Sequence, residues 1–281
     1  MTGSSKVWFI TGAAKGIGHI LAKLLIADGH RVAVTSRDKA ALEQSFAGAG
    51  NLLAPETDLT SETSVKAAVD ATVEAFGAID VVVNNAGYGQ QGTVEALNDE
   101  EYRRNFEVNV FAPLHVMRFA LPHMRRRRSG HIVNIASIVG IQCGYAGWSS
   151  YAATKFALAG LTESLAAEVA EVGIKATVVY PGPVRTDFLS TGSLAVAKRN
   201  IDEYTQAQVS LDLHRNEMDG RQAGDPEKVA RLIINAVVAD EPPLHLFAGK
   251  IANDLAEVKI AAIQKDLDAW REASAATDYS E

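Results

Sequence analysis

The sequence predicts an α/β fold in which one domain contains a doubly wound parallel sheet with helices on both faces. Short runs rich in β-branched residues recur along the chain, and segments with helical apolar spacing separate them. These runs are continuously apolar rather than alternating, which is typical of strands buried on both faces. With 281 residues, 47% of them hydrophobic, the chain suits one large domain, residues 1–281.

The expected elements follow from these two periodicities. Strands are expected at 6–11, 31–35, 79–83, 131–136 and 174–180, with weaker candidates at 51–54 and 244–248. Helices are expected at 17–28, 38–46, 61–76, 99–127 and 151–171. Pro113 falls inside the fourth helical pattern and has no N–H for the helix ladder, so we expect a break or kink near Phe111 and Ala112.

The regular alternation fails between residues 185 and 224. That segment mixes polar and apolar residues with helical patches, and long insertions in compact α/β domains often cover a ligand. We therefore expect a substrate loop or lid at about 187–224. A helical tail is expected at about 250–281.

Charge and composition exclude several classes of function. The chain has 27 basic and 34 acidic residues, a net charge of −7, which argues against general binding to nucleic acid or anionic membranes. The Arg125–Arg128 run is interpreted as a solvated helix C-terminus, where cations are favoured. No apolar stretch approaches the ~20 residues of a spanning helix. The single Cys143 and the absence of a signal-like start predict a cytoplasmic protein.

A glycine-rich turn follows the first expected strand and opens a helix. Its residues are Gly12, Lys15, Gly16, Ile17 and Gly18, within the sequence TGAAKGIG. Glycines permit a tight turn, and a helix N-terminus offers unpaired N–H groups to a pyrophosphate. The spacing is G-x-x-x-G-x-G rather than G-x-G-x-x-G, so a purely structural turn remains an alternative. With the alternating pattern, the turn predicts a Rossmann-type sheet.

The second expected strand ends where such folds read the cofactor ribose. An acidic residue there favours NAD, whereas an arginine accommodates the 2′-phosphate of NADP. This chain has Ser36 followed by Arg37, and Lys15 lies in the glycine turn. The two cations predict NADP(H) in preference to NAD(H), although Asp38 is an alternative partner for Arg37.

Tyr151 and Lys155 lie four residues apart at the start of the fifth helical pattern. That spacing places the phenol and the ammonium on one helix face. A nearby cation lowers the pKa of a phenol, which makes proton exchange with an alcohol or carbonyl oxygen practical. Ser137, fourteen residues earlier, supplies a hydroxyl for the same oxygen. Taken alone, such a Tyr/Lys pair is more often an exposed surface pair.

In this order, the motifs resemble those of the short-chain dehydrogenase/reductase family. They are TGAAKGIG at 11–18, Asp58-Leu59, Asn84-Asn85-Ala86-Gly87, Asn109, Ser137, Tyr151-x-x-x-Lys155 and Pro181-Gly182, and the likeness covers residues 6 to about 240. The chain most resembles NADP-dependent carbonyl reductases and hydroxysteroid- and retinol-dehydrogenase-like members. The resemblance implies interconversion of a ketone or aldehyde and an alcohol by hydride transfer.

The resemblance also implies roles for four residues. Tyr151 is expected to donate or accept the proton, and Lys155 to lower its pKa and bind the nicotinamide ribose. Ser137 is expected to hold the substrate oxygen, and Asn109 to support a water-mediated proton relay. Asn109 is alternatively a capping residue beside Pro113. No metal is expected. The resemblance also implies a homodimer or homotetramer whose subunits are joined by the 99–127 and 151–171 helices.

The remaining cofactor residues are expected on the strand-end loops. Besides the glycine turn, Ser36 and Arg37, they are Asp58, Leu59, Asn85, Ala86, Gly87, Pro181, Gly182, Val184 and Thr186. Asp58 is alternatively a helix N-cap. Pro-Gly-Pro and Asn-Ala-Gly are alternatively plain turns.

A substrate wall is expected between the serine and the tyrosine. With these two residues, its expected members are Ile138, Cys143, Tyr145, Trp148 and Phe188. They predict a medium-sized, largely apolar small molecule, unless these side chains only pack the loop or face another subunit.

The sequence is compatible with two other functions. A dehydratase or epimerase on the same fold would keep the Tyr/Lys pair, but its usual nucleotide-sugar substrates need a larger C-terminal domain. A non-catalytic dinucleotide-sensing protein would tend to lose the tyrosine or the serine, and this chain has Tyr151 and Ser137.

Overall fold

A seven-stranded sheet forms the centre of the computed structural model, which describes residues 5–36, 39–190 and 192–279. All of its neighbouring strands are parallel. The strands are β1 (Val7–Thr11), β2 (Arg31–Thr35), β3 (Leu52–Leu53), β4 (Val81–Asn84), β6 (Gly130–Ile135), β7 (Ile174–Pro181) and β9 (His245–Ala248). Their order, β3-β2-β1-β4-β6-β7-β9, reverses direction between β1 and β4. Doubly wound folds bind ligands at the carboxyl ends of the strands at such a point.

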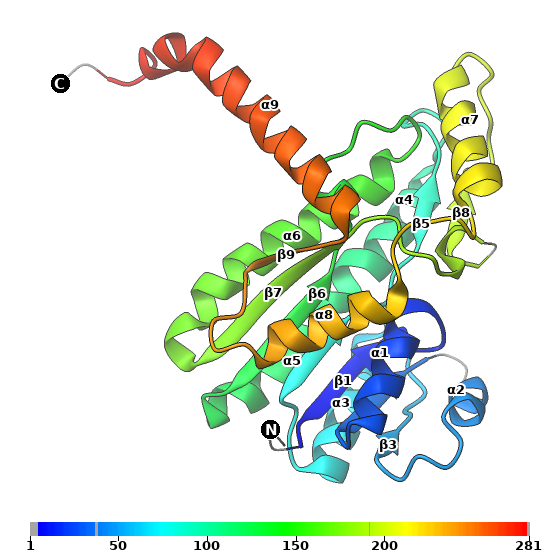
Figure 1. Cartoon of the computed structure of the whole chain (residues 1–281), viewed down its shortest axis with the longest axis vertical. Helices are drawn as coiled ribbons and strands as arrows, with labels where there is room; N and C mark the ends of the chain where they lie inside the picture. The colour runs from blue at the N-terminus through cyan, green and yellow to red at the C-terminus, as the bar shows by residue number, and fades with distance from the viewer. Residues whose placement is uncertain (1–4, 37–38, 191, 280–281) are drawn as a thin grey trace.

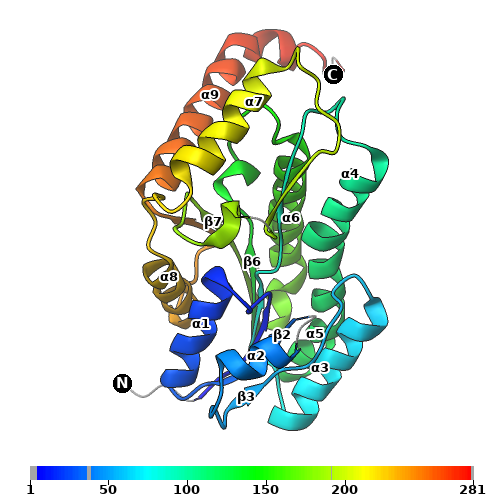
Figure 2. The same cartoon turned by 90° about the vertical axis from the view of Figure 1, so that its right-hand side faces the viewer.

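Helices cover both faces of the sheet (Figure 1; Figure 2). One face is covered by α1 (Gly16–Ala27) and α8 (Pro226–Val238), the other by α3 (Glu62–Phe76), α5 (Ala112–Arg127) and α6 (Ser149–Val169). Strand β1 serves both layers, because Trp8 and Ile10 pack in the first hydrophobic cluster and Phe9 in the second. This two-residue period, with apolar layers on both sides, explains the continuously apolar strands.

The predicted fold class is confirmed, and a strand lies in each of the seven predicted places. Two features were not predicted. Helix α8 begins at an Asp-Pro pair, where the Asp225 carboxylate accepts hydrogen bonds from the backbone N–H groups of Glu227 and Lys228. A separate two-stranded sheet pairs β5 (Gly89–Gln91) with β8 (Leu194–Val196). The two strands are more than 100 residues apart in sequence, so no local sequence pattern predicts their pairing.

The interruption expected near Pro113 takes a different form. Helix α4 (Asp99–Phe106) continues through a π-helical segment, Glu107–Phe111, into α5 without a break. The backbone N–H of Ala112 bonds to the carbonyl of Glu107, five residues back. The wider turn accommodates a proline that has no N–H to donate.

The segment from 187 to 224, where the sequence pattern is irregular, contains several short elements. They are a 3₁₀ turn (Asp187–Leu189), β8, α7 (Thr205–Asp212) and a π-helical turn (Leu213–Met218). The remaining helices are α2 (Lys39–Ser45) and α9 (Lys250–Ala275), which forms the expected helical tail. Within the described ranges, no helix is both long and apolar enough to cross a bilayer.

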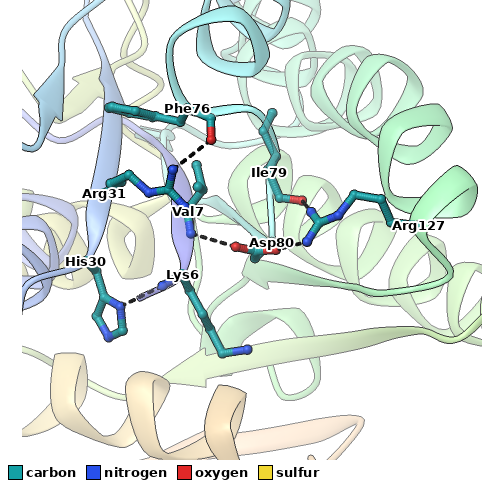
Figure 3. Close-up of polar contacts among 8 residues, drawn as sticks. All are labelled: Lys6, Val7, His30, Arg31, Phe76, Ile79, Asp80 and Arg127. Atoms are coloured by element: carbon teal, nitrogen blue, oxygen red, sulfur yellow. Dashed lines mark hydrogen bonds and ion pairs between the residues drawn. The ribbon is translucent and has the colours of Figure 1, made fainter. Parts of the chain in front are cut away.

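A polar network fixes the amino-terminal end of the sheet (Figure 3). Asp80 accepts a hydrogen bond from the backbone N–H of Val7 at 2.8 Å and forms an ion pair with Arg127 at 2.7 Å. Beside it, Arg31 donates to the carbonyl oxygen of Phe76 at 2.8 Å. These contacts join β1, the chain before β4 and the ends of α3 and α5.

The Arg125–Arg128 run is therefore more than a solvated helix end. Arg127 pairs with Asp80, whose side chain is only 18% exposed. Arg128 ends α5 in the left-handed region, with φ of 51°, and donates to the carbonyl oxygen of Glu171 at 2.6 Å. Both arginines hold neighbouring segments together.

Replacing Asp80 by alanine is expected to lower the free energy of unfolding by about 1–3 kcal/mol, because the N–H of Val7 loses its partner in a partly buried site. Thermal denaturation measures the loss. The matched control is Asp70→Ala, which breaks an exposed i,i+4 pair with Lys66 and should cost less than about 0.5 kcal/mol. Equal losses in both variants would contradict the structural role of Asp80.

Candidate active site

A cleft of about 1710 Å³ opens at the carboxyl ends of the strands. It runs from the glycine turn after β1 to the first turns of α6 and on to the 187–224 segment. This volume exceeds the ~300–1,000 Å³ of an ordinary small-molecule pocket. The cleft therefore has room for two ligands side by side.

The glycine turn is shaped by close packing against the loop that follows β4. Gly12 has φ of +69°, and a Cβ atom there would lie 2.7 Å from the Cα of Ala86. The side-chain amide of Asn85 donates to the carbonyl oxygens of Thr11 and Gly12 at 3.0 and 2.9 Å. A Cβ at Gly18 would lie 2.4 Å from that amide nitrogen. Only glycine fits at either position.

Gly18 thus supports the turn rather than lining the cleft. The other predicted turn residues, Gly12, Lys15, Gly16 and Ile17, do line it. Helix α1 begins next to them, and its N-cap, Lys15, makes no side-chain capping bond. The first N–H groups of α1 thus face a site suited to phosphate oxygens.

A second observation fits a nucleotide at this end of the cleft. Thr35, at the end of β2, lines the cleft, and its hydroxyl is buried without a hydrogen-bond partner among the described residues. A buried hydroxyl of this kind is satisfied by a polar ligand such as a ribose. Ser36, next in the chain, also lines the cleft, whereas the predicted phosphate-binding Arg37 and its neighbour Asp38 lie outside the described residues.

Asp58 and Leu59 line the same end of the cleft. Asp58 accepts hydrogen bonds from the N–H and hydroxyl of Thr60 at 3.0 and 2.7 Å, which fixes its orientation. The alternative interpretation of Asp58 as a helix cap is wrong, because Ser61 is the N-cap of α3. Of the loop after β4, Asn85, Ala86 and Gly87 all line the cleft, as do Pro181, Gly182, Val184 and Thr186 after β7.

Ser137 and Tyr151 meet at the centre of the cleft. Ser137 lies just beyond β6, and Tyr151 lies in the first turn of α6. Burial raises the pKa of Tyr151 above its ordinary value, and the neighbouring Ser137 hydroxyl lowers that pKa by a smaller amount. The tyrosine ring packs at 6.0 Å from Trp148 and 5.6 Å from Phe188. At neutral pH the group is a neutral phenol that can donate a proton.

Lys155 lies one helical turn further along α6, on the same face. Its ammonium donates to the carbonyl oxygen of Ile135 at 2.9 Å and lies 5.7 Å from the centre of the Tyr151 ring. The side chain is only 4% exposed, and burial lowers its pKa from 10.5 to about 8. A Cβ at Gly87 would lie 3.4 Å from the ammonium nitrogen, so glycine leaves space beside the charge.

Asn109 is fully buried in the π-helical segment and does not line the cleft. Its amide nitrogen donates to the carbonyl oxygen of Tyr88 and to the hydroxyl of Thr154, both at 3.0 Å. Its amide oxygen accepts from the N–H of Tyr88 at 3.0 Å. Asn109 therefore connects the loop after β4 to helix α6 and is not the cap that its position beside Pro113 suggested.

The predicted substrate wall is largely brought together. Ile138, Tyr145, Trp148 and Phe188 line the cleft with Ser137 and Tyr151. Cys143 does not line it and instead packs against a hydrophobic cluster that includes Trp148 and Leu189. Trp148 is held by a hydrogen bond from its indole N–H to Ser210 of α7 at 3.1 Å.

Several cleft residues were not predicted. They come from the π-helical turn after α7, the chain before α8 and the first turns of α9, and include His214, Met218, Gln222, Ile251 and Leu255. Gln222 is 4% exposed, and both polar atoms of its side chain are without a partner among the described residues. Its amide therefore offers a donor and an acceptor to a bound ligand. In the sequence, only the i,i+4 spacing of Ile251 and Leu255 gave a sign of a shared face.

No group of histidine, cysteine, aspartate or glutamate side chains suited to a metal ion occurs in the described part of the chain.

Comparisons with known proteins agree with this geometry. A family model for short chain dehydrogenases matches residues 6–194. Oxidoreductase BOA17 of Botryotinia fuckeliana is 33% identical over 97% of this chain and 99% of its own. A 3-ketodihydrosphingosine reductase of Bacteroides thetaiotaomicron is 32% identical over 89% and 90%, and human retinol dehydrogenase 8 is 34% identical over 87% and 81%.

Solved structures also superpose on this chain. A short-chain dehydrogenase from Streptomyces avermitilis superposes with a TM-score of 0.90 and 35% identity, covering 98% of this chain and 100% of the other. A Burkholderia phymatum short chain dehydrogenase/reductase in complex with NAD gives 0.82 and 25%, covering 95% and 96%. ElxO with NADP bound gives 0.72 and 29%, covering 87% and 97%.

Proposed function

The chain belongs to the short-chain dehydrogenase/reductase family and is an oxidoreductase that uses a nicotinamide dinucleotide, and from this premise we propose that it interconverts a ketone or aldehyde and an alcohol. One observation carries the proposal. The hydroxyls of Ser137 and Tyr151 and the ammonium of Lys155 share one cleft with the glycine turn that precedes α1. The nicotinamide, when bound, supplies or accepts the hydride.

The hydroxyls of Tyr151 and Ser137 have different roles at the substrate oxygen. In the reductive direction, Tyr151 gives its proton to the carbonyl oxygen as that oxygen gains negative charge. The Ser137 hydroxyl donates a hydrogen bond to the same oxygen and stabilises the developing charge. Burial keeps Tyr151 protonated before the reaction. In the oxidative direction the same atoms receive the proton from the alcohol.

Lys155 supports the proton transfer electrostatically. With its pKa at about 8, the amine is mostly charged at neutral pH. Its charge, 5.7 Å from the ring centre, favours the phenolate that Tyr151 becomes after it gives up its proton. We assign Lys155 a second task in binding the nicotinamide ribose. Asn109, which positions the chain beside Gly87, is proposed to support the return of a proton from solvent.

For the cofactor, we propose a preference for NADP(H). Lys15 and Ser36 line the cleft where the adenosine ribose of a dinucleotide would lie, and Arg37 follows Ser36 in the sequence. No carboxylate replaces Ser36 at the end of β2, so the site favours a phosphate dianion over a free 2′-hydroxyl.

For the substrate, we propose a medium-sized and largely apolar molecule. Trp148, Leu189 and Leu194 form a buried apolar cluster around Tyr151, and Phe188 and Met218 pack against it. Relatives named for retinol and for 3-ketodihydrosphingosine, both largely apolar molecules, support this class. The 187–224 segment, which supplies much of this wall, is proposed to close over the bound substrate.

The test is oxidation of NADPH and of NADH, followed at the nicotinamide absorbance, with a series of ketones and aldehydes. We expect kcat/KM to be about 10- to 100-fold higher for NADPH than for NADH, since a charge-assisted phosphate contact contributes about 1.5–3 kcal/mol. Rates should rise with the apolar bulk of the carbonyl compound.

Three different results would contradict the reaction, the cofactor preference and the substrate class. No oxidation with any carbonyl compound, together with no reduction of NADP⁺ by the matching alcohols, would exclude the reaction. A preference for NADH would overturn the interpretation of Lys15, Ser36 and Arg37. A best substrate that is small and charged would overturn the substrate class.

A further inference from the structure

A glutamine lies buried in the wall of the cleft, in the short segment between the π-helical turn and α8. Gln222 is only 4% exposed, and neither the oxygen nor the nitrogen of its side-chain amide has a hydrogen-bond partner among the described residues. Burying an amide without partners is unfavourable, and most buried polar atoms of folded proteins are paired. The unpaired amide in a cleft wall therefore indicates a polar ligand.

The backbone around Gln222 is held against the turn that follows β7. The carbonyl oxygen of Gln222 accepts a hydrogen bond from the Nε of Arg185 at 3.1 Å. Two residues later, the N–H of Gly224 donates to the carbonyl oxygen of Pro183 at 2.9 Å. The carbonyl oxygen of Gly224 accepts from the N–H of Arg185 at 2.8 Å. These contacts fix the position of Gln222 and leave its amide free.

The turn after β7 lies beside the residues that we assign to the chemistry. Strand β7 pairs with β6, with Val179 opposite Ile135, and Ser137 follows two residues after Ile135. Hydride transfer requires the nicotinamide to touch the carbonyl group that Ser137 holds. The nicotinamide is therefore expected at this end of the cleft, whereas the adenosine is expected beside β2. Gln222, attached to the turn after β7, is at the nicotinamide end.

The first turn of α9 forms an apolar wall in the same region. A Cβ at Gly182 would lie 3.3 Å from the backbone nitrogen of Ala252, so this helix packs directly on the turn after β7. Ile251 and Leu255 of α9 line the cleft, as does Met218 from the π-helical turn. A largely apolar substrate packs against such side chains but offers no partner to an amide. The nicotinamide, in contrast, carries a carboxamide.

We propose that the side-chain amide of Gln222 binds the carboxamide of the nicotinamide, an inference that rests on the proposed function through the position of the cofactor. A carboxamide presents N–H donors next to an oxygen acceptor, and a glutamine amide presents the same two groups. Placed head to head, the two amides satisfy each other with two hydrogen bonds. The contact fixes the rotation of the nicotinamide ring and so the face that the ring turns toward Tyr151.

The first test measures cofactor binding without any carbonyl compound, by isothermal titration calorimetry of the full-length protein. Gln222→Met keeps the length of the side chain and the backbone contacts but removes the amide. Its Kd for NADP⁺ should be about 10-fold higher than that of the wild type, because two uncharged hydrogen bonds are lost. Its Kd for 2′-phospho-ADP-ribose, which lacks the nicotinamide, should not change. A wild type that prefers NAD⁺ is titrated in the same way with NAD⁺ and ADP-ribose.

Gln142→Met is the matched control. The side-chain oxygen of Gln142 is also buried without a partner among the described residues, but Gln142 is not among the residues that line the cleft. This variant should bind both ligands like the wild type. Circular dichroism and melting temperature check that the two variants are folded.

The second test changes the cofactor instead of the protein. In the 3-acetylpyridine analogue of NADP⁺, a methyl group replaces the carboxamide nitrogen and its donors. The wild type should bind this analogue more weakly than NADP⁺. The ratio of the two Kd values should be at least about threefold smaller in Gln222→Met, because the partner of those donors is then missing.

Four results would overturn the role of Gln222. They are an unchanged Kd for NADP⁺ in Gln222→Met, an equal loss of affinity for the ligand that lacks the nicotinamide, an unchanged analogue ratio, and tight binding of the analogue by the wild type. A higher KM for the carbonyl compound with unchanged cofactor affinity would assign the amide to the substrate instead. A wild type that binds neither NADP⁺ nor NAD⁺ would contradict the proposed function itself.

Discussion

Replacing Tyr151 by phenylalanine is expected to lower kcat by about 10²–10⁴-fold while leaving cofactor binding nearly unchanged. The substitution removes one oxygen atom, the one beside Ser137 to which we assign the transferred proton. The ring contacts with Trp148 and Phe188 remain available to phenylalanine. Steady-state kinetics measures the rate, and quenching of protein fluorescence by NADPH measures binding.

Tyr180→Phe is the matched control for this experiment. Tyr180 is also buried, at 1% exposure, and its hydroxyl lies 3.2 Å from a ring nitrogen of His245. It is not among the residues that line the cleft. Its loss should change kcat by less than about threefold, a small effect compared with that of a general acid. Wild-type turnover in Tyr151→Phe would remove Tyr151 from the mechanism.

Replacing Lys155 by methionine is expected to lower kcat/KM by about 10²–10³-fold, the usual loss when one preorganised electrostatic group is removed. The loss should appear both in KM for the cofactor and in kcat, because the lysine is assigned to ribose binding and to the phenolate. The exposed Lys175→Met, in β7, provides the control and should retain wild-type kinetics. A variant of Lys155 with unchanged kcat would contradict the electrostatic role.

The same variant should alter how stability depends on pH. Burial lowers the pKa of Lys155 from 10.5 to about 8, so the unfolded state binds the proton more tightly than the folded state. Stability of the wild type therefore rises as pH increases from about 8 to 10.5, while methionine contributes no such change. Between pH 7 and pH 10, the free energy of unfolding of the wild type should gain about 2–3 kcal/mol on the variant. Urea denaturation of both proteins at the two pH values measures it, and a constant difference would mean that the lysine is not desolvated.

The sequence by itself determined the fold class and named many residues that the structure places along one cleft. Continuously apolar strands, helical spacing and glycine at the first turn are local patterns, and local patterns can be read without knowing which segments meet. The i,i+4 spacing correctly placed Tyr151 and Lys155 on one face, and the end of the preceding strand placed Ser137 beside them. The glycines at 12 and 18 were singled out as a turn, although their packing against Ala86 and Asn85 was not foreseen.

Only the tertiary structure decided the features that depend on segments distant in sequence. No periodicity in the sequence connects the segments involved. Examples are the β5–β8 pair, the ion pair of Asp80 with Arg127, and the cleft positions of Gln222, Ile251 and Leu255. The same holds for Lys155, whose lowered pKa follows from burial between α6 and the end of β6. Burial is a property of how layers pack, and for that reason the chemistry of a buried charge emerges only when the chain is folded.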